Sequence, residues 1–336
     1  MTAHDTADSR SLAYMRKGLF LAVLSGMIFS LDGLLITRAG TFAPYDDVGL
    51  LLLVTMACAG VHDTCAGVCI TIYNWRTGRL RELVRSAASR PGRAVLGGSA
   101  IGAALGCGGY MAGLQMAGPA YTLPITTMYP AVAALLAFFV LRERIPPRGW
   151  IGLCLCVGGA ALVGYVPPSG QPGSFFYLGL AFAGLAALGW GTQGVCVTSG
   201  MDFVEPEIAL NIYYILSACF YVGLAAPTAA LLSGVDAMTF VGDIVTSRGT
   251  AFLALAGFLG MTSYLAWYKA MNMVGVSRAM ALNISYALWG IGFTALLGNV
   301  EITKTLLVGA VTIFLGMCLV IGNPREMLSL RKDAAS

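Results

Sequence analysis

Ten long apolar stretches, separated by short segments that carry most of the charged residues, constrain this chain more than any other feature of its sequence. A helix of about 20 apolar residues crosses the hydrocarbon core of a bilayer. Charged residues make up only 11% of the chain, whereas an average soluble domain has roughly a quarter. The sequence therefore predicts an all-α membrane protein with ten transmembrane helices. We expect these at about residues 18–37, 48–73, 94–116, 119–141, 149–167, 174–198, 207–232, 250–272, 276–298 and 302–322.

The segments outside these stretches are short. Residues 1–17 and 323–336 form polar tails, and the longest connections, 74–93 and 233–249, are too short for a soluble domain. The first stretch is too long for the apolar part of a signal peptide and lacks a cleavage site. All nine cysteines lie inside the apolar stretches, which favours small apolar packing residues over a disulfide framework.

The basic residues set the expected orientation. If both tails are cytoplasmic, the clusters of arginine and lysine fall on the cytoplasmic side, and only Arg38, Arg248 and Lys304 remain outside. The positive-inside rule therefore predicts two cytoplasmic termini. Lys269 is the one cation that this count assigns to neither side. The residues expected on the cytoplasmic side are Arg10, Arg16, Lys17, Arg76, Arg79, Arg81, Arg85, Arg90, Arg93, Arg142, Arg144, Arg148, Arg278, Arg325, Arg331 and Lys332.

The two halves of the chain resemble each other. A shift of 157 residues places "AGPAYTLPITTMYPAV" (117–132) over "VGVSRAMALNISYALW" (274–289), without a gap across nearly fifty residues. Each half has five stretches, and an odd number turns the second half upside down in the membrane. We therefore predict two inverted five-helix repeats, 18–167 and 174–322, an arrangement in which transporters place their binding site between the halves. The aligned pairs are Gly118 with Gly275, Tyr129 with Tyr286, Ile145 with Ile302, Gly152 with Gly309 and Gly159 with Gly316, and at a slightly different offset Gly18 with Gly179, Phe29 with Trp190, Asp32 with Gln193 and Gly33 with Gly194.

This pattern resembles the drug/metabolite transporter superfamily with its EamA-type repeat. The resemblance covers residues 18–322 and rests on a proline-containing fourth stretch with a charged turn, "MYPAVAALLAFFVLRERI", and a glycine-rich fifth, "IGLCLCVGGAALVGY". Three further segments, "VHD" (61–63), "GWGTQ" (189–193) and "SYLAWYKAMN...ALNISYALW" (263–289), are similar to the bacterial choline permeases of the LicB type. That resemblance implies a bacterial plasma membrane protein that takes up choline or a similar quaternary amine, enclosed by aromatic side chains.

Aromatic residues recur at helical spacing within the apolar stretches. Tyr264, Trp267 and Tyr268 share one face of the eighth stretch. A quaternary ammonium has no N–H to donate, so ring faces are its natural partners. The alternatives are an interfacial aromatic belt, above all for Trp267 and Tyr268, or ordinary packing. The predicted substrate-binding residues are Trp190, Tyr264, Tyr286, Trp289, Trp267, Tyr268, Phe29, Gln193 and Asn283.

Ionisable side chains inside the stretches form a second set of candidates, because burying a charge in the membrane is costly. His62 and Asp63 lie midway along the second stretch and are predicted to take and release a proton during transport; the alternative is a structural pair. Asp32 either shares this coupling role or pairs with Arg38 in an outer vestibule. Asp32 or Asp63 alternatively balances the charge of a cationic substrate.

Lys269 leaves the substrate open. Its side chain either snorkels to the headgroups, forms an ion pair at a gate, or binds the carboxylate of a zwitterionic substrate. The choline permeases have no such lysine, and they carry Trp where Phe29 stands and an acidic residue where Gln193 stands. These departures do not affect the expected fold.

Other functions are disfavoured. Cys58, His62, Cys65 and Cys69 share one helix face, but no further cluster of acidic residues or histidines accompanies them, so no metal or other cofactor is expected. No HExxH motif, P-loop or Ser/His/Asp set is present, so an enzyme is not expected.

The sequence thus predicts a secondary-active transporter that imports a small organic cation by alternating access, choline or a related quaternary amine being favoured, with proton coupling as an additional hypothesis. Its expected partners are the substrate, the lipid bilayer and protons, and no nucleic acid. The alternative within the same superfamily is an exporter of amino acids or aromatic metabolites, with a broad multidrug exporter third.

Overall fold

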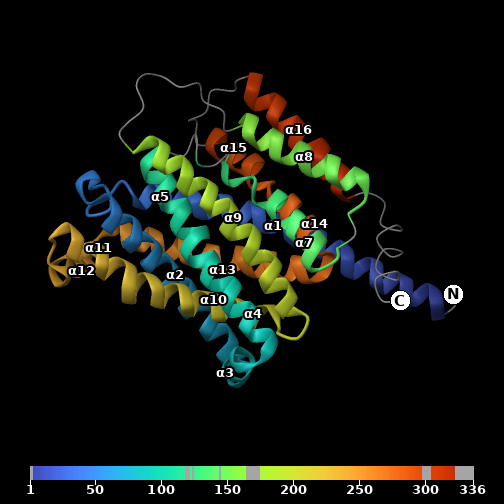
Figure 1. The fold of residues 1–336 in the computed structure, drawn as a ribbon, viewed down its shortest axis with the longest axis horizontal. Coiled ribbons are helices and arrows are strands. Elements are labelled where there is room, and N and C mark those ends of the chain that lie inside the picture. Colours follow the sequence, from blue (N-terminus) through green and yellow to red (C-terminus); the bar gives the residue numbers. More distant parts are fainter. Residues whose placement is uncertain are drawn as a thin grey trace.

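The computed structural model describes residues 3–117, 122, 125–143, 145–163, 175–296 and 304–321, and these residues form helices and connections without a strand (Figure 1). The helices are α1 (Ala3–Ala39), α2 (Leu51–Arg76), α3 (Leu80–Ala88), α4 (Arg90–Ile101), α5 (Gly108–Ala117), α7 (Tyr129–Val140), α8 (Pro147–Val163), α9 (Phe176–Met201), α10 (Pro206–Phe220), α11 (Ala226–Ser233), α12 (Ala237–Thr246), α13 (Arg248–Val274), α14 (Val276–Asn283), α15 (Tyr286–Leu296) and α16 (Lys304–Ile321). A 3₁₀ turn covers Val48–Leu50, and π-helical turns cover Gly102–Cys107 and Tyr221–Ala225.

Six helical segments within the described residues are long and apolar enough to cross a membrane. They are Leu12–Ala39, Leu51–Arg76, Arg90–Gly113, Phe176–Met201, Pro206–Ser233 and Arg248–Val274. Each of the other four predicted stretches contains a shorter helix or pair of helices among the described residues, namely α7, α8, α14 with α15, and α16. The helical, apolar character predicted from the sequence is therefore confirmed.

Several predicted boundaries differ from the structure. The polar tail predicted for residues 1–17 is helical from Ala3 onward, as the start of α1. The two long connections contain the short helices α3 and α12. Asp236 starts α12, because its carboxylate accepts a hydrogen bond from the backbone N–H of Thr239 at 2.8 Å. The predicted tail 323–336 lies outside the described residues.

The ninth predicted stretch is broken rather than continuous. A turn at residues 284–285 separates α14 from α15, so Asn283 ends one helix and Tyr286 begins the next. In the fourth stretch α7 begins at Tyr129, which follows a turn at residues 127–128 and precedes Pro130. The side chains of Asn283 and Ser285 compete for local backbone hydrogen bonds, which accounts for the first break. Pro130 has no backbone N–H to continue a preceding helix, which accounts for the start of α7.

Helices from the two halves of the chain pack against one another. α1 runs along α13, α9 lies against α4 and α5, α2 lies against α10, and α8 lies against α16. Figure 1 shows α8 and α16 side by side at one edge of the bundle, and α3 beyond the ends of α2 and α4 at another. Small residues allow these close approaches.

The connection between α7 and α8 is anchored to the second half of the chain. Glu143, in this connection, accepts a hydrogen bond from the backbone N–H of Ser277 at 3.4 Å, at the start of α14. Burial raises the pKa of Glu143, although the nearby Arg278 acts in the opposite direction. Gly275 has φ +87° and passes directly beside this carboxylate, a conformation and a proximity that favour glycine.

The crossing of α8 and α16 gives a direct test of this packing. A Cβ atom on Gly159 would lie 2.8 Å from the carbonyl oxygen of Gly309, whereas a Cβ atom on Gly158 would meet nothing within 4 Å. Gly159→Val should therefore lower the stability of the purified protein by about 1–3 kcal/mol, and Gly158→Val should change it little. Thermal unfolding in detergent measures both, and equal melting temperatures for the two variants would contradict the packing.

Candidate functional site

Aromatic rings from six helices line one cavity. The rings touch one another, with centroids 5.2 Å apart for Tyr110 and Trp190 and 5.4 Å apart for Phe29 and Tyr286. We call this space the aromatic cavity. Its lining residues are Ser25, Phe29, Tyr110, Thr126, Tyr129, Trp190, Ser263, Tyr264, Trp267, Asn283 and Tyr286.

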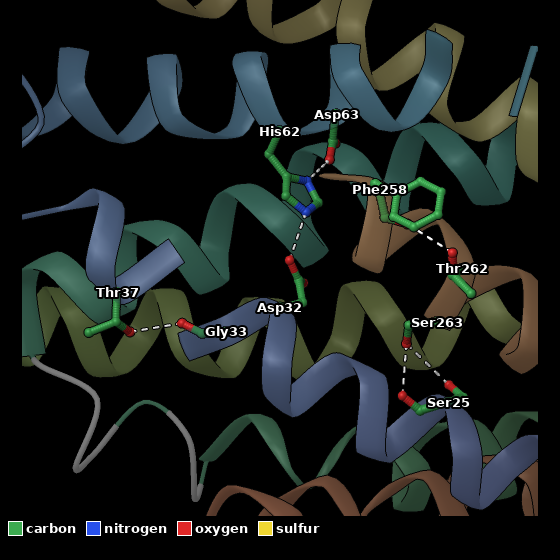
Figure 2. A network of polar contacts seen from close by, with 9 residues as sticks. All are labelled: Ser25, Asp32, Gly33, Thr37, His62, Asp63, Phe258, Thr262 and Ser263. Carbon is green, nitrogen blue, oxygen red and sulfur yellow. Dashed lines mark hydrogen bonds and ion pairs between the residues drawn. The ribbon is translucent and has the colours of Figure 1, made fainter. Parts of the chain in front are cut away.

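One corner of the aromatic cavity is polar. Asn283 donates a hydrogen bond from Nδ2 to Ser25 Oγ at 2.8 Å and accepts one from the Tyr129 hydroxyl at 2.7 Å. Ser263 donates from its hydroxyl to the Ser25 carbonyl oxygen at 2.9 Å (Figure 2). The two serine Oγ atoms are 3.4 Å apart, a long hydrogen bond. Because Ser263 uses its only hydroxyl proton on the Ser25 carbonyl, the Ser25 hydroxyl is the donor in this long contact, and a ligand hydroxyl in the cavity would compete for the Ser25 proton.

Close helix contacts hold this corner in place. A Cβ atom on Gly26 would lie 2.6 Å from the Asn283 carbonyl oxygen, so α1 lies directly against the break between α14 and α15. The hydroxyl of Ser30 donates to the Tyr286 carbonyl oxygen. Backbone groups at a helix break need such partners where no water is available.

A second cavity contains the acidic cluster and shares Phe29, Tyr110, Trp190 and Tyr264 with the aromatic cavity. We define the acidic cluster as Asp32, His62 and Asp63. The second cavity is lined by Phe29, Asp32, Gly33, Ile36, His62, Asp63, Cys107, Tyr110, Met111, Trp190, Tyr213, Tyr214 and Tyr264.

Both ring nitrogens of His62 face carboxylates (Figure 2). Nδ1 lies 2.7 Å from Asp63 Oδ1, and Nε2 lies 3.2 Å from Asp32 Oδ1. An ionised carboxylate only accepts hydrogen bonds, so this geometry suits an imidazolium that donates on both sides. Ser217 of α10 donates to the other oxygen of Asp63. With both aspartates ionised and His62 protonated, the acidic cluster carries one net negative charge.

The structure shows which side chain Asp32 contacts, and its role in coupling stays a prediction. Asp32 contacts His62 rather than Arg38, whose guanidinium lies over the ring of Phe42 at 5.3 Å from its centroid. A Cβ atom on Gly260 of α13 would lie 2.7 Å from His62 Nε2, so glycine at this position leaves room for the imidazole.

Three predicted substrate-binding residues lie outside both cavity walls. Gln193 donates from Nε2 to the Tyr268 hydroxyl at 2.9 Å, and both side chains are fully buried. Trp289 is 37% exposed and stacks on Phe293. Trp289 was placed by continuing a helical spacing through residues 284–285, where the helix in fact breaks.

Lys269 is held in an ion pair. Its Nζ atom lies 2.7 Å from Glu207 Oε1, which joins α13 to the first turn of α10. Glu205, two residues before Glu207, forms a second ion pair, in which its Oε2 atom lies 2.7 Å from Arg79 Nε. Lys269 lines neither cavity, so of the three arrangements considered for it the structure contains the ion pair.

Some lining residues were not among the predicted site residues. Extending the 157-residue shift aligns Tyr110 with Trp267 and Thr126 with Asn283, so the repeat itself contained the signal for two of them. Ser25 and Ser263 had no such signal, because single hydroxyl residues are common at helix contacts in membranes.

The sequence profile of the EamA-like transporter family matches residues 16–165 and again residues 177–322. The chain belongs to this family. It is also 26% identical to Protein LicB of Haemophilus influenzae (strain ATCC 51907 / DSM 11121 / KW20 / Rd) over 286 residues, which are 84% of this chain and 89% of LicB. The resemblance stated from the sequence is therefore confirmed.

A solved crystal structure has the same fold as this chain. It superposes with a TM-score of 0.66 at 16% sequence identity, covering 90% of this chain and 98% of the other. At this identity the likeness shows the fold alone. Together with the apolar helices, the family match identifies a multi-pass membrane transporter of the drug/metabolite superfamily.

Proposed function

We propose that this EamA-like transporter is a secondary-active carrier that imports choline or a related small quaternary amine through the aromatic cavity. One observation carries the proposal. Seven aromatic rings line this one cavity, and none of its lining residues in the described part of the chain is charged. Such a wall binds a desolvated cation through ring faces, each contributing up to about 2 kcal/mol.

The charges near the cavity favour a cation over a carboxylate. The acidic cluster lies in the adjoining cavity, behind four shared aromatic rings. A carboxylate substrate would need a basic partner, and Lys269 is already paired with Glu207 outside both walls. These contacts disfavour the alternative, an exporter of amino acids or aromatic metabolites.

The polar corner favours a substrate that also has a hydroxyl group. Choline has its hydroxyl two carbons from the ammonium nitrogen, so its two ends require different surroundings. The aromatic cavity offers ring faces on most sides and the hydroxyl of Ser25 at one corner. We propose that Ser25 and Asn283 bind the substrate hydroxyl.

We propose ten transmembrane helices in two inverted five-helix repeats, 18–167 and 174–322, with the cavity between them. Reciprocal contacts support this symmetry. A Cβ atom on Gly152 would meet the backbone of Gly316, and one on Gly159 would meet the backbone of Gly309. In the repeat alignment Gly152 corresponds to Gly309 and Gly159 to Gly316, so exchanging the two repeats converts one contact into the other.

The cavity wall has the same reciprocity. Tyr129 donates to Asn283, and its repeat mate Tyr286 is hydrogen-bonded to Thr126, the repeat mate of Asn283. Carriers of this architecture rock one half against the other around a central site. The clusters of basic residues support cytoplasmic termini in a bacterial plasma membrane.

We also propose that the acidic cluster couples transport to protons. Asp32 belongs to α1, whereas His62 and Asp63 belong to α2. Any movement of α1 relative to α2 changes the distance between Asp32 and His62, and hence the affinity of the imidazole for its proton.

Replacing ring faces tests the proposed substrate class. Trp190→Leu and Tyr264→Leu keep an apolar side chain and remove a π-face, so each should raise KM for choline about tenfold, since tenfold corresponds to about 1.4 kcal/mol. Trp289→Leu, outside the cavity, is the matched control. Uptake is measured in proteoliposomes of phosphatidylethanolamine and phosphatidylglycerol. Equal losses for choline and its neutral analogue 3,3-dimethylbutanol would contradict recognition of the cation.

Removing the Ser25 hydroxyl tests the polar corner. Ser25→Ala should weaken choline uptake several-fold, as expected for the loss of a hydrogen bond of about 1 kcal/mol, and leave inhibition by tetramethylammonium unchanged. Thr262→Ala is the control, because the Thr262 hydroxyl donates to Phe258 within its own helix (Figure 2). A parallel loss for both ligands would show that Ser25 does not bind the hydroxyl.

An imposed proton gradient tests the acidic cluster. The initial rate of uptake by the unaltered protein should change with the gradient, and Asp32→Asn should abolish that dependence because it removes one carboxylate partner of His62. Asp46→Asn, at an exposed position, serves as the control. A rate in the unaltered protein that does not respond to the gradient would exclude coupling.

A further inference from the structure

We propose that the connection between α2 and α4 binds the headgroups of anionic phospholipids. Residues 76–93 contain six arginines and one glutamate, a net charge of +5, whereas the whole chain carries only +4. The net positive charge of the protein is therefore concentrated in this one segment. We call its five exposed arginines, Arg76, Arg81, Arg85, Arg90 and Arg93, the arginine face.

The helix α3 presents two of these arginines on one side. Leu83 and Ala87 pack against the hydrophobic core, and Arg81 and Arg85, four residues apart, lie together on another side of the helix. Val84 is 76% exposed. A short helix with a basic side and exposed apolar residues suits the plane of the membrane surface.

The position of α3 in the structure agrees with a location at the membrane surface. Trp75, at the end of α2 and just before the arginine face, is 67% exposed. Exposed tryptophan at a helix end is typical of the membrane–water interface. Figure 1 shows α3 beyond the ends of α2, α4 and α10, at the edge of the bundle.

Within the described residues, the arginine face lacks the kind of carboxylate partner that Arg79 has. Arg79 is paired with Glu205 at 2.7 Å. For the five arginines of the arginine face, no carboxylate among the described residues lies within ion-pair distance. Anionic phospholipid is the complementary partner present at this depth, and guanidinium groups bind phosphate in a bidentate geometry.

A bound lipid would be connected to the interior of the protein. Arg79 lies within the same segment and binds Glu205, which immediately precedes α10. Two residues later Glu207 binds Lys269 on α13, the helix that carries Tyr264 and Trp267. Lipid bound to the arginine face would therefore stabilise the end of the bundle where these ion pairs join the start of α3 to α10 and α13.

The test uses the purified full chain in detergent, titrated with dioleoylphosphatidylglycerol or with dioleoylphosphatidylethanolamine while the melting temperature is measured. The unaltered protein should be stabilised by phosphatidylglycerol at lower concentrations than by phosphatidylethanolamine. The variant R81Q/R85Q/R90Q should bind phosphatidylglycerol on the order of tenfold to a hundredfold more weakly. R81K/R85K/R90K, which keeps the charge but loses the bidentate geometry, should bind phosphatidylglycerol with an affinity between those of the unaltered protein and R81Q/R85Q/R90Q.

Glu82→Gln gives the opposite sign at the same site. It removes the only carboxylate of the segment and should strengthen the binding of phosphatidylglycerol. An unchanged affinity in both R81Q/R85Q/R90Q and Glu82→Gln would overturn the proposal. Equal stabilisation by inorganic phosphate would assign the site to free phosphate, and arginine-dependent dimerisation without lipid would assign it to a second copy of this chain; either result would also overturn it.

Discussion

The contact between α1 and the break that separates α14 from α15 is the interaction on which the site depends. The break places Asn283 and Tyr286 at the cavity and frees backbone groups that need hydrogen-bond partners in the membrane. Gly26 allows α1 to approach the Asn283 carbonyl, and Ser30 donates to the carbonyl of Tyr286. The same approach brings Ser25 to Asn283 and so forms the polar corner. A larger residue at position 26 would separate all of these groups.

The chain separates its aromatic surface from its buried charge. The aromatic cavity has neutral walls, and the acidic cluster lies in the adjoining cavity, where His62 bridges two carboxylates. Removing charges from water is expensive, and the histidine between the aspartates reduces that cost. In the proposed mechanism the cluster attracts a cation from behind the rings without contacting it directly, which leaves the aspartates free to respond to protons.

Much of this organisation was predictable from the sequence, because hydrophobic length and repeated residues are properties of the chain itself. The long apolar helices follow from such patterns, and so does the alignment of Tyr129 with Tyr286 in the two repeats. The contact between Asp32 and His62 was not predictable, since it joins two helices whose rotation is set by packing. The position of Trp289 could not be predicted either. The helical spacing that predicted it at the site stops at the break, which the local sequence marks only by Asn283 and Ser285.

Saturable uptake of labelled choline into proteoliposomes free of phosphatidylcholine tests the central claim most directly. Betaine, carnitine, phenylalanine and guanidinium serve as unlabelled competitors, together with tetramethylammonium. The account predicts saturable choline uptake that tetramethylammonium inhibits and phenylalanine does not. Absence of choline uptake, with competition by zwitterionic amino acids in a binding assay, would contradict the account and would transfer the site to the amino acid alternative.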